Sequence, residues 1–152
     1  MYERPSVEVL QDIDNPTKLG WWVNDKELTH AYCFINLSAD NHDFHTLEAS
    51  QIEAAEVVIF RRDELKKWLE DNIGKTDKDI IEDAASLVDS LSDKKKYSSC
   101  VYLKKSSYMK KQRPINLVLP LDTLKRLPHS LHLLVVPNKK PKRIQVYNNP
   151  NV

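Results

Sequence analysis

The chain has 152 residues, of which 41% are hydrophobic and 30% are charged, a composition typical of a globular domain with one core. Only Gly20 and Gly74 are glycines, and neither GxGxxG nor GxxxxGK[ST] occurs, which excludes the common glycine-rich phosphate-binding loops. No apolar run approaches the roughly 18 residues that span a bilayer, so we expect no membrane contact.

The cysteines and the first residues predict the compartment. Cys33 and Cys100 lie far apart in apolar stretches, a pattern typical of buried, reduced thiols, although a disulfide is the alternative. The opening MYERPSVEVL lacks the charged and then apolar pattern of a signal peptide. We therefore expect a cytoplasmic protein.

Charge is distributed unevenly along the chain. Residues 1–93 contain 9 Lys and Arg against 21 Asp and Glu, whereas residues 94–152 contain 14 Lys and Arg against one acid, Asp122. We expect a single domain, 1–152, with an acidic part (1–93) and a basic part (94–152). Such asymmetry favours a polyanion-binding surface beside an acidic one. The alternative is that the two parts attract each other and pack together.

The first third of the sequence predicts mostly strands. Alternation in SVEVL predicts a strand over residues 6–10, and DIDNPT has turn chemistry. LGWWV and THAYCFINL predict strands over 19–23 and 29–37, because aromatic and β-branched residues favour strands. A polar loop over 38–50 then precedes a short helical turn and a strand at EVVIF, residues 56–60.

Helical patterns follow, and then strands return. Apolar residues at i, i+3 and i+4 predict a helix over 61–72, and a second apolar stripe predicts a helix over 76–93 with Thr76 as N-cap. The basic part predicts a short helix at LDTLKRLP and strands at SSCVYL (98–103), INLVLP, SLHLLVVP and KRIQVYNN. This order indicates an α/β (α+β) fold, with a central mixed sheet flanked by a few helices.

The strongest functional pattern is the alternation of lysine with tyrosine in the basic part. Lysine neutralises phosphates, and tyrosine stacks on unpaired bases, so this composition predicts a nucleic-acid-binding surface. The predicted contact residues are Lys94, Lys95, Lys96, Tyr97, Tyr102, Lys104, Lys105, Tyr108, Lys110, Lys111, Arg113, Lys139, Lys140, Lys142 and Arg143. The excess of lysine over arginine favours contact with the phosphate backbone over reading of bases. A lysine-rich surface that only aids solubility is the alternative.

No metal site is predicted from histidine and cysteine. The loop DNHDFH contains His42 and His45, yet it lacks paired cysteines and is not an HExxH helix. Histidines in such polar loops are usually exposed to solvent.

The stretch VEVLQDIDNPTKLGWW, with Glu8, Asp12, Asp14 and Lys18, combines carboxylates with a lysine beside a turn. Metal-dependent cleavage of phosphodiesters uses carboxylates to hold a divalent ion and a lysine to stabilise charge. The order of this stretch and of the segments up to residue 72 resembles the PD-(D/E)XK (restriction-endonuclease-like) nuclease superfamily. That resemblance implies a nuclease-like scaffold, with these four residues as the catalytic candidates and Mg²⁺ as the cofactor if the site is catalytic.

The sequence also departs from the pattern of that family. Leu10 stands where the motif has a lysine two residues after Glu8, and no acid-bearing strand and helix precede Glu8. The resemblance therefore implies a degenerate member that has lost independent catalysis.

The adjacent tryptophans are the predicted interface residues. In a strand, neighbouring side chains point to opposite faces, so one of Trp21 and Trp22 is expected to pack inward and the other to face a partner. Three hypotheses follow for the chain as a whole. It is expected to bind nucleic acid on a nuclease-like scaffold without catalysis of its own. The alternatives are a metal-dependent nuclease subunit and an acidic protein-interaction module, such as an inhibitor or adaptor.

Overall fold

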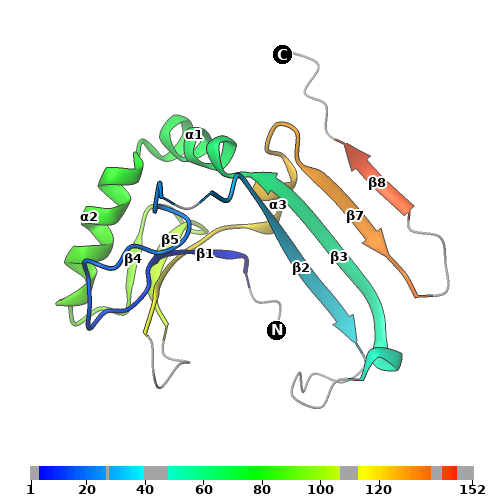
Figure 1. Cartoon of the computed structure of the whole chain (residues 1–152), viewed down its shortest axis with the longest axis horizontal. Helices are drawn as coiled ribbons and strands as arrows, with labels where there is room; N and C mark the ends of the chain where they lie inside the picture. Colours follow the sequence, from blue (N-terminus) through cyan, green and yellow to red (C-terminus); the bar gives the residue numbers. More distant parts are fainter. Residues whose placement is uncertain (1–3, 27, 40–47, 107–112, 138–141, 147–152) are drawn as a thin grey trace.

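A computed structural model describes residues 4–26, 28–39, 48–106, 113–137 and 142–146, with the backbone alone for residues 49 and 142–146. In these ranges the strands form two antiparallel sheets of four strands each (Figure 1). Sheet A has the order β1-β6-β5-β4, and sheet B has the order β2-β3-β7-β8. The strands of sheet A are β1 (Ser6–Leu10), β4 (Lys94–Lys96), β5 (Tyr102–Lys105) and β6 (Ile115–Val118). Those of sheet B are β2 (Ala31–Ala39), β3 (Ile52–Arg61), β7 (Leu131–Val135) and β8 (Lys142–Val146).

Three α-helices accompany the sheets in the described ranges. They are α1 (Arg62–Ile73), α2 (Asp77–Val88) and α3 (Leu121–Lys125), and a short 3-10 turn, η1 (Ala49–Gln51), precedes β3. The α+β class is therefore confirmed. The sequence predicted one central mixed sheet, whereas the described ranges form two antiparallel sheets.

Local chemistry explains where α2 begins, and distinct contacts accompany the ends of α1 and α2. The hydroxyl of Thr76 and the carboxylate of Asp79 form a reciprocal capping box at the start of α2, as the sequence predicted. The helix ends at Val88, five residues before the predicted end, and the ammonium of Lys105 donates to the carbonyl oxygen of Val88 at 3.0 Å. Gly74 ends α1 with a φ of 69°, a left-handed conformation that favours glycine.

One predicted strand is wrong, and another begins later than predicted. Residues 21–23 form a turn, and only Leu19 bridges to Leu10 beyond the edge of sheet A. A Cβ at Gly20 would lie 2.3 Å from the carbonyl oxygen of Glu8, so this close approach requires glycine. In the basic part, β5 begins at Tyr102 rather than at residue 98, and the lysine run 94–96 is itself a strand because it pairs with β5.

One hydrophobic cluster joins the two sheets. It contains Leu117 from sheet A, Phe60 from sheet B and Leu65 from α1, and the indole of Trp22 is fully buried within it. The predicted burial of both thiols is wrong for Cys33, which is exposed on β2, whereas Cys100 is half-buried, and both cysteines are free.

Candidate nucleic-acid interface

The register of sheet A separates its side chains into an inner and an outer face. Residues directly opposite each other on antiparallel strands share a face. The inner face carries Val7, Leu117, Leu103 and Lys95, and α2 packs against this side (Figure 1). The outer face carries two rows across the four strands. One row is Glu8, Asn116, Lys104 and Lys94, and the other is Ser6, Val118, Tyr102 and Lys96.

Two of the predicted nucleic-acid-binding lysines have partners inside the protein. Lys95 points to α2 and donates to Asp83 at 2.5 Å. Burial acts to raise the pKa of Asp83, but the ammonium groups of Lys95 and Lys75 outweigh it and lower that pKa overall. Lys105 donates to the carbonyl oxygens of Val88 and Ser90, where cations stabilise a helix C-terminus. These two lysines therefore hold α2 on sheet A.

Three lysines lie on the outer face and are exposed. Lys94, Lys96 and Lys104 form no ion pair with any residue that the structure describes. The ammonium of Lys94 lies 5.7 Å from the ring centre of Tyr102, within the range of a cation–π contact. Tyr102 is half-buried among them. The outer face thus presents three unneutralised positive charges around one aromatic ring.

The remaining predicted contact residues lie elsewhere. Tyr97 is half-buried near Asp83, and burial raises the pKa of its hydroxyl, so this tyrosine does not belong to the outer face. Arg113 pairs with Asp14. Lys142 and Arg143 lie on β8, at the edge of sheet B, so the second basic cluster does not share a sheet with the first. Tyr108, Lys110, Lys111, Lys139 and Lys140 lie outside the described residues.

Glu8 occupies the same outer face as the lysines, at its β1 end. It lies in one row with Asn116, Lys104 and Lys94. Desolvation raises the pKa of Glu8, although the backbone N–H of Trp21 and the charge of Lys18 act in the opposite direction. A carboxylate at this end of the face limits the region that attracts an anion to β4 and β5.

The two aspartates among the catalytic candidates do not form a metal-binding group with Glu8. The carboxylate of Asp12 accepts from the backbone N–H of Asp14 at 3.2 Å, which forms a local turn, and Asp14 pairs with Arg113. Within the described ranges no three His, Cys, Asp or Glu side chains are grouped to hold a metal ion. Lys18 influences Glu8 through its charge. The catalytic assignment of these four residues stays a prediction.

The two tryptophans differ in exposure. Trp22 is 0% exposed and belongs to the core, so it offers no surface to a partner. Trp21 is partly exposed and packs on Tyr32, with ring centres 4.6 Å apart. The predicted interface role therefore stays a prediction for Trp21 alone.

Contacts between the acidic and basic parts account for some of the charge asymmetry. Asp83 pairs with Lys95, and Glu56 pairs with Lys125 at 2.6 Å and with His132 at 2.8 Å. The two parts of the chain thus attract each other in several places, as the alternative interpretation expected. The three outer lysines are the exposed basic residues of sheet A that these contacts leave unneutralised within the described structure.

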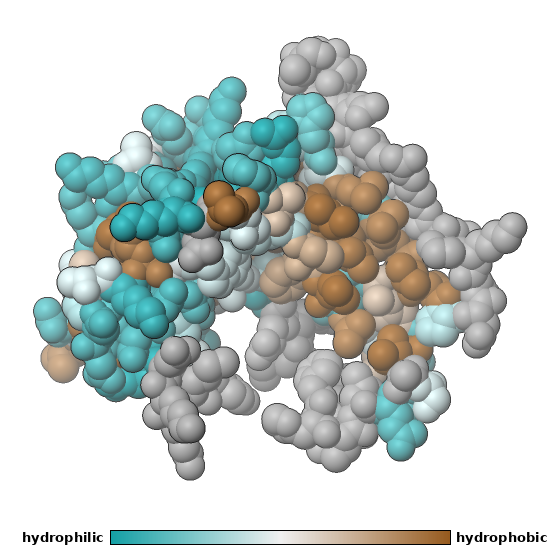
Figure 2. Space-filling view, viewed as in Figure 1, coloured by the Kyte–Doolittle hydropathy of each residue, from teal (hydrophilic) through white to brown (hydrophobic). Residues whose placement is uncertain are grey.

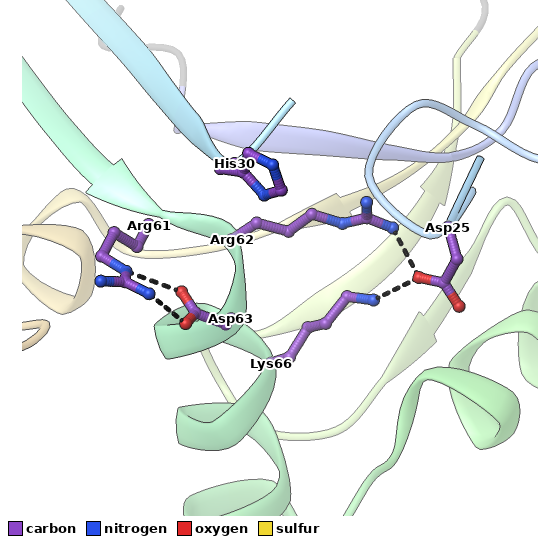
Figure 3. Close-up of a pocket in the computed structure, with 6 residues that line it drawn as sticks. All are labelled: Asp25, His30, Arg61, Arg62, Asp63 and Lys66. Atoms are coloured by element: carbon purple, nitrogen blue, oxygen red, sulfur yellow. Dashed lines mark hydrogen bonds and ion pairs between the residues drawn. The ribbon is translucent and has the colours of Figure 1, made fainter. Parts of the chain in front are cut away.

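A polar pocket of about 220 Å³ lies where β3 meets α1 (Figure 3). Its charged groups bond mainly to one another. The nearly buried Arg62 donates to the carbonyl oxygen of Trp22 at 2.6 Å and to Asp25 at 3.0 Å, and Lys66 also reaches Asp25. Arg61 holds Asp63 through two hydrogen bonds. This arrangement connects the turn after β1 to the start of α1, which is a structural role.

These observations define an α+β protein with a basic outer sheet face. A comparison with protein-family models, curated proteins and solved structures finds no match to this chain. None of the helices in the described ranges has the length and apolar character to cross a membrane.

Sequence reasoning missed Asn116 as a member of the outer face of sheet A, because only the pairing of β6 with β5 shows that it lies beside Lys104.

Proposed function

We propose that this protein binds nucleic acid through the outer face of sheet A. The observation that carries the proposal is the group of Lys94, Lys96 and Lys104 around Tyr102, exposed and without acidic partners in the described structure. Strand geometry holds these side chains on one surface, so they act together on a nearby polyanion.

The composition of the face favours contact with the phosphate backbone. Lysine is a compact charge that attracts phosphate without fixed geometry, and each neutralised phosphate releases condensed counterions. Tyr102 adds an aromatic ring on which an unpaired base stacks. The proposal therefore favours single-stranded over double-stranded nucleic acid. Catalysis is not part of it.

Binding is tested by fluorescence anisotropy with labelled single- and double-stranded DNA and RNA oligonucleotides at several salt concentrations. For the native protein we expect affinity to fall steeply with salt. The triple variant Lys94→Ala, Lys96→Ala, Lys104→Ala should bind more weakly, and its log–log salt slope should be shallower by about 2–3.

A matched control removes the same charge elsewhere. The variant Lys26→Ala, Lys67→Ala, Lys78→Ala also removes three exposed lysines, but from the acidic part of the chain. It should retain most of the affinity and nearly the native salt slope. Equal losses in the two triple variants would mean that net charge alone governs binding, and no binding to any oligonucleotide at low salt would refute the proposal.

Tyr102→Ala separates stacking from charge. We expect it to weaken binding to single strands by about 1–3 kcal/mol and to leave binding to duplexes nearly unchanged. A location in the cytoplasm belongs to the same proposal. The free thiols of Cys33 and Cys100 support it, since thiols persist in reducing compartments.

A further inference from the structure

Sheet B has one face that the described chain leaves uncovered. Val58 and Phe60 of β3 point into the core, so their neighbours Val57 and Ile59 point outward. Ile35, which pairs with Val57, is 56% exposed. We name this surface the outer face of sheet B. Its apolar members are Ala31, Cys33, Ile35, Leu37, Ala55, Val57, Ile59, Leu131, Leu133 and Val135.

Figure 2 shows hydrophobic residues gathered over sheet B, in contrast with the hydrophilic surface around α1 and α2. Antiparallel sheets with one solvated face normally alternate apolar and polar residues, and strands that are apolar on both sides are typical of sheets covered on both sides. The segment Val57–Phe60 of β3 reads VVIF and is apolar on both sides. The sequence is therefore suited to a sheet with a second cover.

We propose that this cover is the same face of a second copy of the chain. The two outer faces of sheet B pack against each other about a two-fold axis. The axis runs across the strands, over the row formed by Ile35, Val57 and Leu133. Each copy then places this row against the same row of its partner, as an isologous interface requires. Sheets that pack this way lie about 10 Å apart and cross at about 30°.

The exposed charges of β3 fit this pairing. Its two exposed charged residues are Glu53 and Arg61, which lie at equal sequence distances on either side of Val57. Arg61 pairs with Ala31, and Glu53 lies at the irregularity where the register of β2 and β3 shifts. The proposed axis turns the second β3 antiparallel to the first, so each Glu53 faces the other copy's Arg61. Arg61 uses Nε and Nη2 to hold Asp63, and a guanidinium has five donors, so further N–H groups are available for a second acceptor.

The area of the face reaches the lower limit for a specific dimer interface. With a strand spacing of about 4.8 Å and a rise of about 3.3 Å per residue, the four strands project an area on the order of 450 Å² per copy. The accessible surface of a face covered with side chains exceeds its projection. Two copies therefore bury on the order of 1,000 Å² or more, which reaches the lower range of specific interfaces.

The first experiment measures the mass in solution by light scattering after size exclusion, over protein concentrations from about 1 to 200 μM. We expect about twice the chain mass of 17.7 kDa at the upper concentrations. Ile35→Asp places a charge at the centre of the face and should raise the dimer dissociation constant at least about 100-fold. Because Ile35 is exposed in the monomer, the variant should still fold, which circular dichroism checks.

Leu91→Asp is the matched control. Leu91 is also an exposed apolar residue, but it lies after α2, away from sheet B. This variant should form the dimer as the native chain does. A native protein that stays monomeric over the whole range would overturn the proposal, as would a dimer that Ile35→Asp and Leu91→Asp affect equally.

A charge exchange tests the two-fold arrangement itself. Glu53→Lys and Arg61→Glu each place like charges against each other and should weaken the dimer by about tenfold. The double variant restores opposite charges across the axis and should recover most of this loss. If the double variant is weaker than either single variant, the proposed axis is wrong. This inference does not depend on nucleic-acid binding.

Discussion

In the part of the chain that the structure describes, each sheet has one covered face and one open face, and the open faces differ in chemistry. Sheet A presents Lys94, Lys96 and Lys104 around Tyr102, whereas sheet B presents a row of Ile35, Val57 and Leu133. Water solvates the first face well, and the second exposes apolar area to water. The two proposals therefore assign a different class of partner to each face, a polyanion to sheet A and an apolar protein surface to sheet B.

The largest expected effect comes from the covered side of sheet A. Leu103 is fully buried and its neighbour on β5, Lys104, points outward. Leu103→Ala should lower the free energy of unfolding by about 2–5 kcal/mol, because it leaves a cavity. Lys104→Ala should change it by no more than about 0.5 kcal/mol. Urea unfolding measures both, and similar losses would show that the outer face of sheet A also contributes to the fold.

An intermediate effect distinguishes the two sides of sheet B. Val58→Ala should lower the free energy of unfolding by about 2 kcal/mol, because Val58 is fully buried. At protein concentrations too low for the dimer to form, Val57→Ala should lower the free energy of unfolding by less than half as much, because Val57 is partly exposed in the monomer. Chemical denaturation at low and high protein concentration tests this pair. Equal costs at low concentration would mean that the outer face of sheet B is already covered in the monomer.

The smallest effect concerns the acid at the edge of the basic face. Burial raises the pKa of Glu8 in the folded protein, so the folded state binds this proton more tightly than the unfolded chain does. The contribution of Glu8 to stability is therefore present below its unfolded pKa and is lost as pH rises through its folded pKa. Glu8→Gln should remove this loss and raise the free energy of unfolding at pH 7 by no more than about 0.5 kcal/mol.

The same substitution bears on function. A neutral side chain at position 8 removes a negative charge from the row that contains Lys104. Anisotropy titration should then show about twofold tighter binding to an oligonucleotide at low salt, because like-charge repulsion between the carboxylate and phosphate is lost. Weaker binding by Glu8→Gln would contradict the assignment of Glu8 to the edge of the face.

The sequence predicts features that depend on nearby residues better than features that depend on pairing. The capping box of Thr76 and Asp79 and the apolar stripe of α2 are local, so both could be predicted before the structure. Three consecutive lysines disfavour a strand on propensity alone, and β4 exists because it pairs with β5.

The candidate site shows the same limit. Composition predicts a basic surface, but it does not distinguish Lys95, which holds α2, from Lys94 and Lys96, which face outward. That distinction follows from the register of β4 against β5, which involves residues about eight positions apart in the chain. The placement of Glu8 on the same face depends on a pairing over more than a hundred residues, between β1 and β6.

The two glycines have a consequence for the unfolded chain. Gly20 is required for space and Gly74 for its left-handed backbone, and the sequence has no other glycine but eight prolines. Glycine widens the range of backbone conformations in an unfolded chain, and proline narrows it. The unfolded ensemble of this protein is therefore restricted, and folding loses less backbone entropy per residue than in a glycine-rich chain of equal length. The smaller loss of backbone entropy favours folding around a small hydrophobic core that the two sheets share.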